Sequence, residues 1–208
     1  MKSALFKDTI REIKKTFGRF ISIFGIVLVG VAFFVGVKAS APYMKRSADA
    51  YFDRENLFDL KIYSPIGFSD DDVEKVRDID GISQAEGAYA ANAIANVGTS
   101  EKVFQIMSYD PDDSDPVNKL TLVEGRMPEK SGECVIRYYG MRDGELGIGD
   151  TLKLNSGSDV AITDSTLDAD TYTVVGKVTT PYYLSYQYDS ASIGSGKVEY
   201  LMFLPKDE

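Results

Sequence analysis

An uninterrupted apolar run near the N-terminus constrains the fold of this chain more than any other feature. Residues 20–37 read FISIFGIVLVGVAFFVGV and carry no charge. As a helix these residues would rise about 27 Å, which nearly spans the hydrocarbon core of a bilayer. Arg19 and Lys38 flank the run, and Lys38 can reach the bilayer surface with its long side chain. The sequence therefore predicts a transmembrane helix over residues 20–38, whose glycines leave room for a neighbouring helix.

A cleaved secretory signal is the alternative interpretation of the same run. Ala39, Ser40 and Ala41 form an A-x-A cleavage pattern. Cleavage there would leave Pro42 at the first mature position, where it is expected to obstruct processing, and the apolar run is longer than that of most signals. We therefore expect an uncleaved anchor. Six Lys or Arg residues precede the span and three follow it before residue 47, so the N-terminus is expected in the cytoplasm and the body outside.

The residues before the span have the pattern of a basic amphipathic helix. Apolar residues recur at intervals of four and three, at Phe6, Ile10, Ile13, Phe17 and Phe20. Basic residues occupy the opposite side, at Lys7, Arg11, Lys14 and Lys15. Residues 1–19 can therefore lie along the anionic cytoplasmic surface of a membrane. Two interpretations stay open: a positively charged anchor alone, or a helix that docks on a cytoplasmic partner through Phe6, Ile10, Ile13, Lys14 and Phe17.

Charge and composition exclude several functions. The chain has 23 Lys and Arg residues against 32 Asp and Glu residues, and nearly all the acidic ones follow residue 46, which argues against a nucleic-acid-binding body. Because the sequence has no His and a single Cys, it cannot form a Ser-His-Asp triad, a Cys-His pair, a His- or Cys-rich zinc site or an intrachain disulfide. Cys134 lies in the apolar-leaning run 133–136, and we expect it to be buried. Spacing selects no carboxylate pair, calcium loop or phosphate loop, so we expect no catalytic, cofactor-binding or metal-binding residues.

The body after residue 56 has the pattern of an α+β domain in two lobes, joined to the span by a connecting segment at 39–56. An α+β lobe, with a helix packed on a sheet, is expected at 57–118: a strand at 57–64, a short helix opened by Ser69, and apolar runs at 88–97 and 103–109. A β-rich small barrel or sandwich is expected at 119–208, with strands at 133–139, 151–155, 171–178 and 198–204. The sequence stops directly after a strand and before any second span, as a truncated piece would.

Four tyrosines cluster after Pro181, at Tyr182, Tyr183, Tyr186 and Tyr188. One interpretation is that the rings pack across a hairpin. The other is a partner-binding surface, because a tyrosine offers an apolar face and a hydroxyl and costs little to order. Both interpretations stay open.

Short motifs along the chain resemble those of MacB/FtsX-type ABC transporter permeases. In the head they are Phe6-Lys7-Asp8, Arg11-Glu12-Ile13-Lys14-Lys15 and Gly18-Arg19-Phe20-Ile21-Ser22-Ile23. In the body they are Glu124-Gly125-Arg126-Met127-Pro128, Gly132-Glu133-Cys134-Val135-Ile136, Leu146-Gly147-Ile148-Gly149-Asp150-Thr151-Leu152 and Tyr172-Thr173-Val174-Val175-Gly176-Lys177-Val178. The motifs occur in the family's order and cover nearly the whole chain.

This resemblance implies the N-terminal part of a permease subunit in the cell membrane. Such subunits dimerise and pair with a cytoplasmic ABC ATPase, so ATP hydrolysis would belong to that partner and not to this chain. Helix motion driven by ATP would move the extracytoplasmic domain, which acts on a peptide, lipoprotein, antibiotic or cell-envelope partner. Two other classes remain: a single-pass membrane-anchored binding or sensor protein, and a wall- or lipid-modifying enzyme that uses carboxylates. The enzyme is disfavoured because no nucleophile has a recognisable base.

Overall fold

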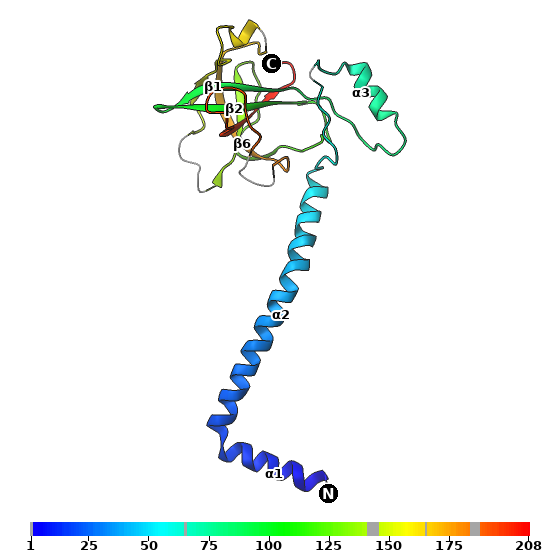
Figure 1. Ribbon diagram of the computed structural model, residues 1–208, viewed down its shortest axis with the longest axis vertical. Coiled ribbons are helices and arrows are strands. Elements are labelled where there is room, and N and C mark those ends of the chain that lie inside the picture. Colours follow the sequence, from blue (N-terminus) through cyan, green and yellow to red (C-terminus); the bar gives the residue numbers. More distant parts are fainter. Residues whose placement is uncertain (1, 65, 141–145, 165, 184–187) are drawn as a thin grey trace. The chain divides into compact units, whose positions relative to one another are not determined.

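The computed structural model describes residues 2–64, 66–140, 146–164, 166–183 and 188–208 (Figure 1). The chain divides into two compact units, Met1–Tyr51 and Phe52–Glu208. The first unit is helical, and the second holds the sheet. Each unit is described by itself below.

The N-terminal unit contains a short helix, α1 (Lys2–Lys15), and most of a long helix, α2 (Phe17–Arg54). The two helices meet at an angle at Thr16 (Figure 1). Thr16 donates its hydroxyl proton to the carbonyl oxygen of Glu12 at 2.9 Å, a side-chain bond that bends helices, and Gly18 follows with no side chain to stiffen the turn. The basic helix expected over residues 1–19 therefore ends at Lys15.

Helix α2 is long and apolar enough to cross a membrane. It has 38 residues, its most apolar 18-residue window has a mean hydropathy of 2.7, and none of that window is buried within the protein. The helix also continues through Pro42 as far as Arg54, so most of the segment expected to connect span and body is helical.

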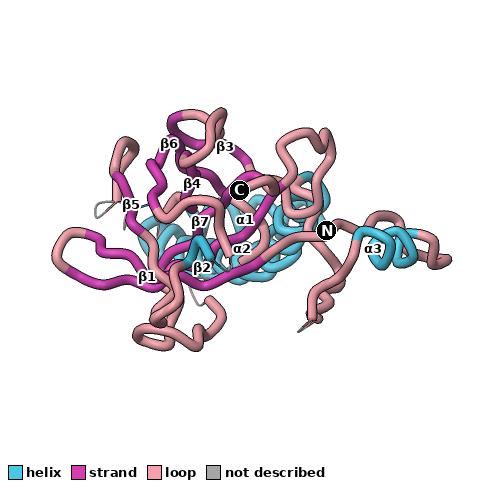
Figure 2. Tube along the Cα trace, turned by 90° about the horizontal axis from the view of Figure 1, so that it is seen from above, coloured by secondary structure: helices cyan, strands magenta, loops and turns pink. Residues whose placement is uncertain are grey.

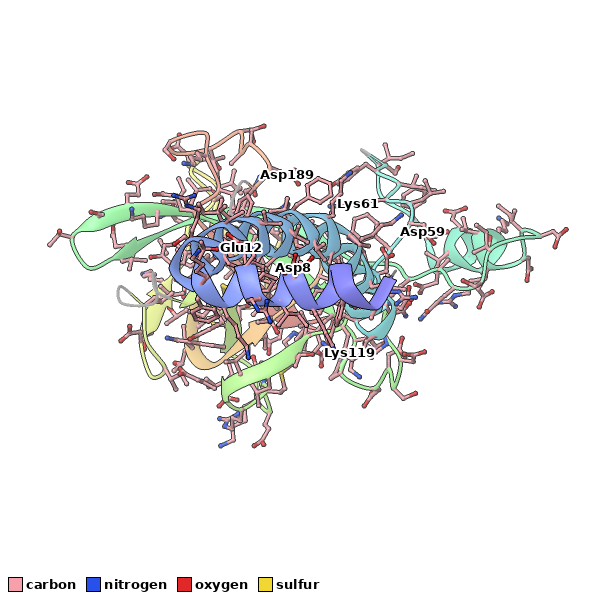
Figure 3. All side chains as sticks on the ribbon, turned by 90° about the horizontal axis from the view of Figure 1, so that it is seen from below. Asp8, Glu12, Asp59, Lys61, Lys119 and Asp189 are labelled. Carbon is pink, nitrogen blue, oxygen red and sulfur yellow. The ribbon has the colours of Figure 1, made fainter. Side chains whose placement is uncertain are left out.

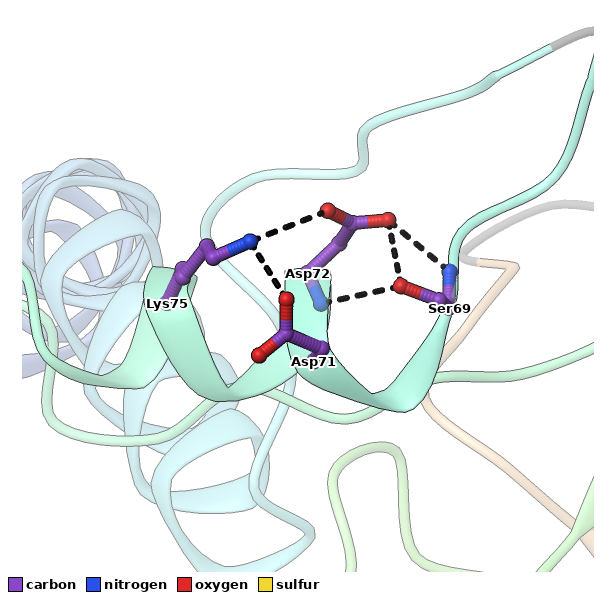
Figure 4. A network of polar contacts seen from close by, with 4 residues as sticks. All are labelled: Ser69, Asp71, Asp72 and Lys75. Carbon is purple, nitrogen blue, oxygen red and sulfur yellow. Dashed lines mark hydrogen bonds and ion pairs between the residues drawn. The ribbon is translucent and has the colours of Figure 1, made fainter.

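Helix α3 (Asp70–Arg77) begins at a capping box (Figure 4). The backbone N–H of Asp72 donates to the Ser69 hydroxyl at 3.3 Å, and the Asp72 carboxylate accepts the Ser69 backbone N–H at 3.0 Å. Lys75 pairs with Asp71 one turn away. The expected helix start at Ser69 is confirmed. No residue of α3 is buried, so this helix adds no layer to the core.

The body is built on one seven-stranded sheet. Its strands are β1 (Ala90–Val97), β2 (Ser100–Tyr109), β3 (Thr121–Gly125), β4 (Glu133–Arg137), β5 (Thr151–Lys153), β6 (Thr171–Thr179) and β7 (Tyr200–Pro205). The order is β1-β2-β7-β4-β6-β3, with β5 also paired to β6. The β2–β7 and β4–β6 pairs are parallel, and the other pairs are antiparallel. A short 3-10 helix, η2 (Ile162–Asp164), follows β5.

The sheet closes on itself into a small barrel. Ile94 in β1 and Asn155 just after β5 exchange two backbone hydrogen bonds, of 2.9 and 2.8 Å, which join the β1 end of the sheet to the β5–β6 end. Figure 2 shows the strands curling around a common interior. The α+β class is confirmed. Strands from both expected lobes enter this one sheet, because β2 from the 57–118 segment pairs with β7 from the 119–208 segment.

Apolar side chains cover both faces of the sheet. The inner cluster fills the barrel, with Phe104, Cys134, Ile136, Leu152, Tyr172 and Met202 among its members. The outer cluster lies on the other face and includes Val103, Met107, Val135, Val178, Leu201 and Phe203. Burial of Cys134, which the sequence predicted, is confirmed.

Two elements differ from the sequence-based expectation. The strand expected at 57–64 is absent from the described residues of that segment, and the side chains of Leu60 and Ile62 are exposed rather than half-buried. Strand β3 was not expected. It is short and exposed along its length, so its sequence carries no alternating pattern, and it forms because β6 offers it a pairing edge.

Candidate functional site

A continuous row of aromatic rings crosses the body. We call it the aromatic row, and its members in spatial order are Phe58, Tyr182, Tyr183, Tyr188, Tyr139, Tyr200 and Phe104. Successive ring centroids lie 5.3, 4.9, 5.1, 6.5, 5.5 and 5.0 Å apart. These separations are within the range of favourable aromatic pairs. The row therefore links the segment after α2 to the interior of the barrel.

Arg137, at the end of β4, fixes the middle of the row. Its guanidinium donates to the Tyr188 hydroxyl at 3.0 Å and to the Tyr183 backbone carbonyl at 2.9 Å. The same group lies over the Tyr188 ring, 5.4 Å from its centroid. One strand-borne cation thus positions both tyrosines.

The Tyr139 hydroxyl accepts the backbone N–H of Leu201 at 2.9 Å, deep in the body. Burial raises the pKa of this phenol well above its ordinary value. Tyr139 therefore stays neutral, and its hydrogen bond ties the segment after β4 to β7.

The Tyr183 hydroxyl forms a polar end to the row. It lies 2.6 Å from Asp189 Oδ2 and 2.8 Å from Gln105 Oε1, with Gln105 almost fully buried in β2. Burial, and then the hydrogen bond to Asp189, raise the pKa of the Tyr183 phenol well above its ordinary value. The phenol is therefore a donor at neutral pH, and it holds Asp189 in place.

Lys61 adds a positive charge beside the row. Its ammonium lies 4.4 Å from the centroids of both the Tyr63 and Tyr182 rings. Figure 3 labels Lys61 and Asp189, the two opposite charges on this part of the body. With Arg137, Lys61 and Asp189 beside it, the row therefore offers a recognition surface of aromatic rings, two cations and one anion.

An open groove of about 500 Å³ lies next to the polar end of the row. Its lining residues are Tyr63, Ala90, Ala91, Asn92, Gln105, Asp189 and Ser190. The floor is the outer face of β1 and β2, and Tyr63, Asp189 and Ser190 come from loops.

The structure brings three of the four predicted tyrosines together. Tyr182, Tyr183 and Tyr188 are half-buried and pack against the outer cluster. Tyr186 lies outside the described residues. Sequence reasoning missed Lys61, Arg137 and Asp189. Tyrosine density pointed to the place. Arg137 reaches it from the end of β4, Lys61 reaches it from the segment after α2, and Asp189 directly follows Tyr188 in the sequence.

The predicted coupling residues lie on α1 and at the start of α2. Phe6, Ile10 and Phe17 are exposed, Lys14 is exposed, and Ile13 is partly covered within its own unit. Because most of the apolar stripe is exposed within that unit, it is available to a membrane surface or to a second protein.

The chain leaving α2 is tied to the start of β3. Glu55 is 6% exposed, and its carboxylate accepts the Thr121 hydroxyl proton at 2.7 Å. The Thr121 hydrogen bond is the main reason why the pKa of Glu55 is lowered. The backbone N–H groups of Asn118 and Lys119 donate to the carbonyls of Asn56 and Glu55 at 2.8 and 3.0 Å. We call this set of contacts the α2–β3 joint.

Three observations concern metal-binding and reactive side chains among the described residues. They contain no group of three or more metal-ligating side chains. Burial raises the pKa of the Cys134 thiol to about 12, which removes it as a nucleophile. Glu86 has a raised pKa because it is half-buried, but its carboxylate accepts the Val117 backbone N–H at 2.8 Å and so serves a loop.

Comparison with known proteins gives one family and one solved structure. A model of the MacB-like periplasmic core domain matches residues 20–206. No curated protein matches the chain. A crystal structure of the extracellular domain of the noncanonic ABC-type transporter YknZ from Gram-positive bacteria is similar, with 14% sequence identity and a TM-score of 0.40. The similarity covers 69% of this chain and 65% of that one, which is less than two thirds of its length.

Proposed function

Because the chain belongs to the family of the MacB-like periplasmic core domain, we propose that it is the N-terminal part of an ABC transporter permease subunit. The family match over residues 20–206 carries this proposal, since it includes the apolar part of α2 as well as the body. The subunit would convert ATP hydrolysis in a partner into movement of its extracytoplasmic domain. That domain would act on a peptide, lipoprotein, antibiotic or cell-envelope partner.

Residues 20–38 are the proposed membrane anchor, with the N-terminus in the cytoplasm. The excess of Lys and Arg before the span supports this orientation. The glycines at positions 25, 30 and 36 have open space around them, so a second helix can approach α2 closely. They support pairing with a second permease copy within the bilayer.

Helix α1 is the proposed contact with the cytoplasmic ABC ATPase. An apolar stripe that includes Phe6, Ile10, Ile13 and Phe17 exceeds what orientation in the membrane requires, and Lys14 adds a charge beside it. A helix that only set topology would need the basic residues alone.

The α2–β3 joint is the proposed route by which a helix movement reaches the barrel. Glu55 follows α2 directly and is buried against Thr121, so a displacement of that end of α2 pulls on the first residue of β3. Strand β3 is paired to β6, which also pairs with β4 and β5.

The surface that meets the extracytoplasmic partner would be the aromatic row, through Tyr182, Tyr183 and Tyr188.

The test of this function replaces the apolar stripe and keeps the charges. In the full-length permease, Phe6→Ser, Ile10→Ser and Ile13→Ser together should abolish co-purification with the ATPase subunit and ATP-dependent activity. The matched control, with Leu at the same three positions, keeps the stripe apolar and should behave like the wild type. Unchanged ATPase association by the Ser variant would reduce α1 to an anchor.

A second measurement separates the proposal from an anchored binding or sensor protein. Affinity purification of the natural protein from membranes should recover an ABC ATPase in a fixed ratio. Recovery of the protein without any ATPase, under conditions that preserve known ABC complexes, would favour the binding or sensor protein.

A further inference from the structure

The outer edge of β1 carries unused backbone hydrogen-bonding groups beside the groove. Strands β1 and β2 form a hairpin in which Val97 pairs with Ser100 and Asn92 with Gln105. The backbone groups of Ile94 bond to Asn155 on the side away from β2, whereas the carbonyl of Tyr89 accepts the backbone N–H of Ser108 in β2. Because this direction alternates along an antiparallel strand, the backbone groups of Ile94, Asn92 and Ala90 all point outward, away from β2. The outward N–H and C=O groups of Ala90 and Asn92 have no hydrogen-bond partner among the residues that the structure describes.

This stretch of edge also lacks the features that protect natural sheet edges. Charged residues, prolines and bulges usually stop a free edge from pairing with another chain. Strand β1 reads AANAIANV, has no charge and no proline, and pairs with β2 without a register shift. The barrel closure at Ile94 and Asn155 covers the middle of the strand and leaves Ala90–Asn92 open.

The edge is rigid before any partner arrives. Ala93 and Phe104, which pair across the hairpin just inside the open stretch, are fully buried in the inner cluster. A partner that pairs with Ala90–Asn92 would therefore meet a preformed template and would not have to order it.

The groove beside this edge selects the side chains of an incoming strand. Ala90 and Ala91 are small and leave room, whereas Tyr63 forms an apolar wall. Asp189 is exposed at the rim, and the Tyr183 hydroxyl holds one of its carboxylate oxygens. The opposite charge nearby, Lys61, is engaged with the Tyr63 and Tyr182 rings. Lys61 keeps its charge but does not line the groove, and Asp189 is the charged residue among those that do.

We propose that the Ala90–Asn92 edge of β1 binds an extended, basic peptide segment of an extracytoplasmic protein by strand addition. The segment pairs antiparallel with β1 and continues the pattern that Asn155 begins at Ile94. A Lys or Arg of the segment meets Asp189, in keeping with the acidic charge of the body. The proposal deepens the partner-binding role given above, but it uses the strand edge and not the rings of the aromatic row.

The test uses the whole chain in detergent micelles and two fluorescein-labelled peptides. Both peptides alternate Thr and Val, and the central residue is Lys in one and Glu in the other. By fluorescence anisotropy the Lys peptide should bind, and the Glu peptide should bind about tenfold more weakly. Absence of Lys-peptide binding up to about 1 mM would overturn the proposal.

Backbone variants locate the binding site. Asn92→Pro and Ala90→Pro each remove one outward N–H and leave the hydrogen bonds between β1 and β2 in place. Each should therefore lower the affinity for the Lys peptide about five- to tenfold. Asn92→Thr keeps the N–H, so its affinity for the Lys peptide should stay within about twofold of that of the wild type. Near-UV circular dichroism checks the fold of each variant. Wild-type affinity in both proline variants would overturn the proposal.

A charge variant gives a second test that leaves the strand untouched. Asp189→Lys should reverse the preference, so that the Glu peptide binds more tightly than the Lys peptide. The same preference in wild type and variant would remove Asp189 from the site. If the peptides fail to bind while Asn92→Pro changes the oligomeric state of the chain, a second copy occupies the edge and the proposal is wrong. These assays contain no ATPase, so they stand apart from the tests of α1.

Discussion

The backbone N–H of Asn118 donates to the carbonyl oxygen of Asn56 at 2.8 Å, and both asparagines have left-handed backbones, with φ of 56° and 51°. The Asn118 side chain also accepts the Phe58 backbone N–H at 3.2 Å. The Asn56 side chain donates to Gln84 at 2.8 Å and to the Pro116 carbonyl at 3.2 Å. Two turns that lie far apart in the sequence thus fix each other at the point where the chain leaves α2.

Replacement of Asn118 should separate the backbone effect from the side-chain effect. Asn118→Ala loses the bond from Phe58 and places an alanine in a left-handed conformation, so we expect a loss of about 2 kcal/mol of unfolding free energy. Asn118→Gly loses only the side-chain bond and should cost about 1 kcal/mol. Denaturant unfolding of the chain in detergent measures both. An equal cost for the two variants would show that the left-handed backbone contributes nothing.

The pair formed by Arg126 and Glu133 should make stability depend on pH in the acid range. Arg126 makes a two-pronged contact with Glu133, one bond of which is 2.6 Å, and the guanidinium lowers the pKa of Glu133 to about 2. A lowered folded-state pKa stabilises the protein above the ordinary value of 4.5, and that stability disappears as the pH falls toward 2.

Comparison of Glu133→Gln with the wild type tests this dependence. The variant should melt at a lower temperature than the wild type at neutral pH, and the two should converge at pH of about 2. A difference in melting temperature that stays constant over the acid range would assign the effect of the substitution to packing, not to charge.

Cys134 should be unreactive in the folded protein. Its side chain is fully buried in the inner cluster, and burial raises its pKa to about 12, so the thiolate is scarce and inaccessible at neutral pH. Maleimide should label the chain only after denaturant is added, as mass spectrometry would record. Rapid labelling under native conditions would mean that the barrel opens at β4.

Two substitutions at Tyr183 should separate ring packing from hydrogen bonding. Tyr183→Phe keeps the ring against Tyr182 and Tyr188 and loses the contacts with Asp189 and Gln105, for about 1 kcal/mol. Tyr183→Ala removes the half-buried ring as well and should cost about 2 to 3 kcal/mol. Thermal unfolding monitored by near-UV circular dichroism measures the loss of stability in both variants. If the Ala variant is as stable as the Phe variant, the ring is free for a partner.

Local signals in the sequence predicted the local elements well. Ser69 and Asp72 indicate the start of α3, because a capping box is formed by two residues that are only three positions apart in the sequence. The apolar runs at 88–97 and 103–109 become β1 and β2, since a two-residue turn at Gly98 and Thr99 joins neighbours in sequence. The alternation at 57–64 failed as a signal, because a strand also needs a pairing partner.

Long-range pairing accounts for what the sequence could not reveal. No local pattern shows that Phe104 lies next to Tyr200, or that Ile94 closes the sheet against Asn155. The same holds for the candidate site. Four tyrosines in a short stretch drew attention to its place, whereas Arg137 and Gln105 reach the tyrosines only because β4 and β2 flank β7 in the sheet.

The position of β7 in the middle of the sheet sets the order in which the body can be made. Strand β7 separates β2 from β4, although it follows all the other described strands in the sequence. During synthesis, β1 and β2 can form their hairpin early, but the strand that lies between β2 and β4 is missing until residues 200–205 have left the ribosome. The seven-stranded sheet therefore stays incomplete until β7 has been translated.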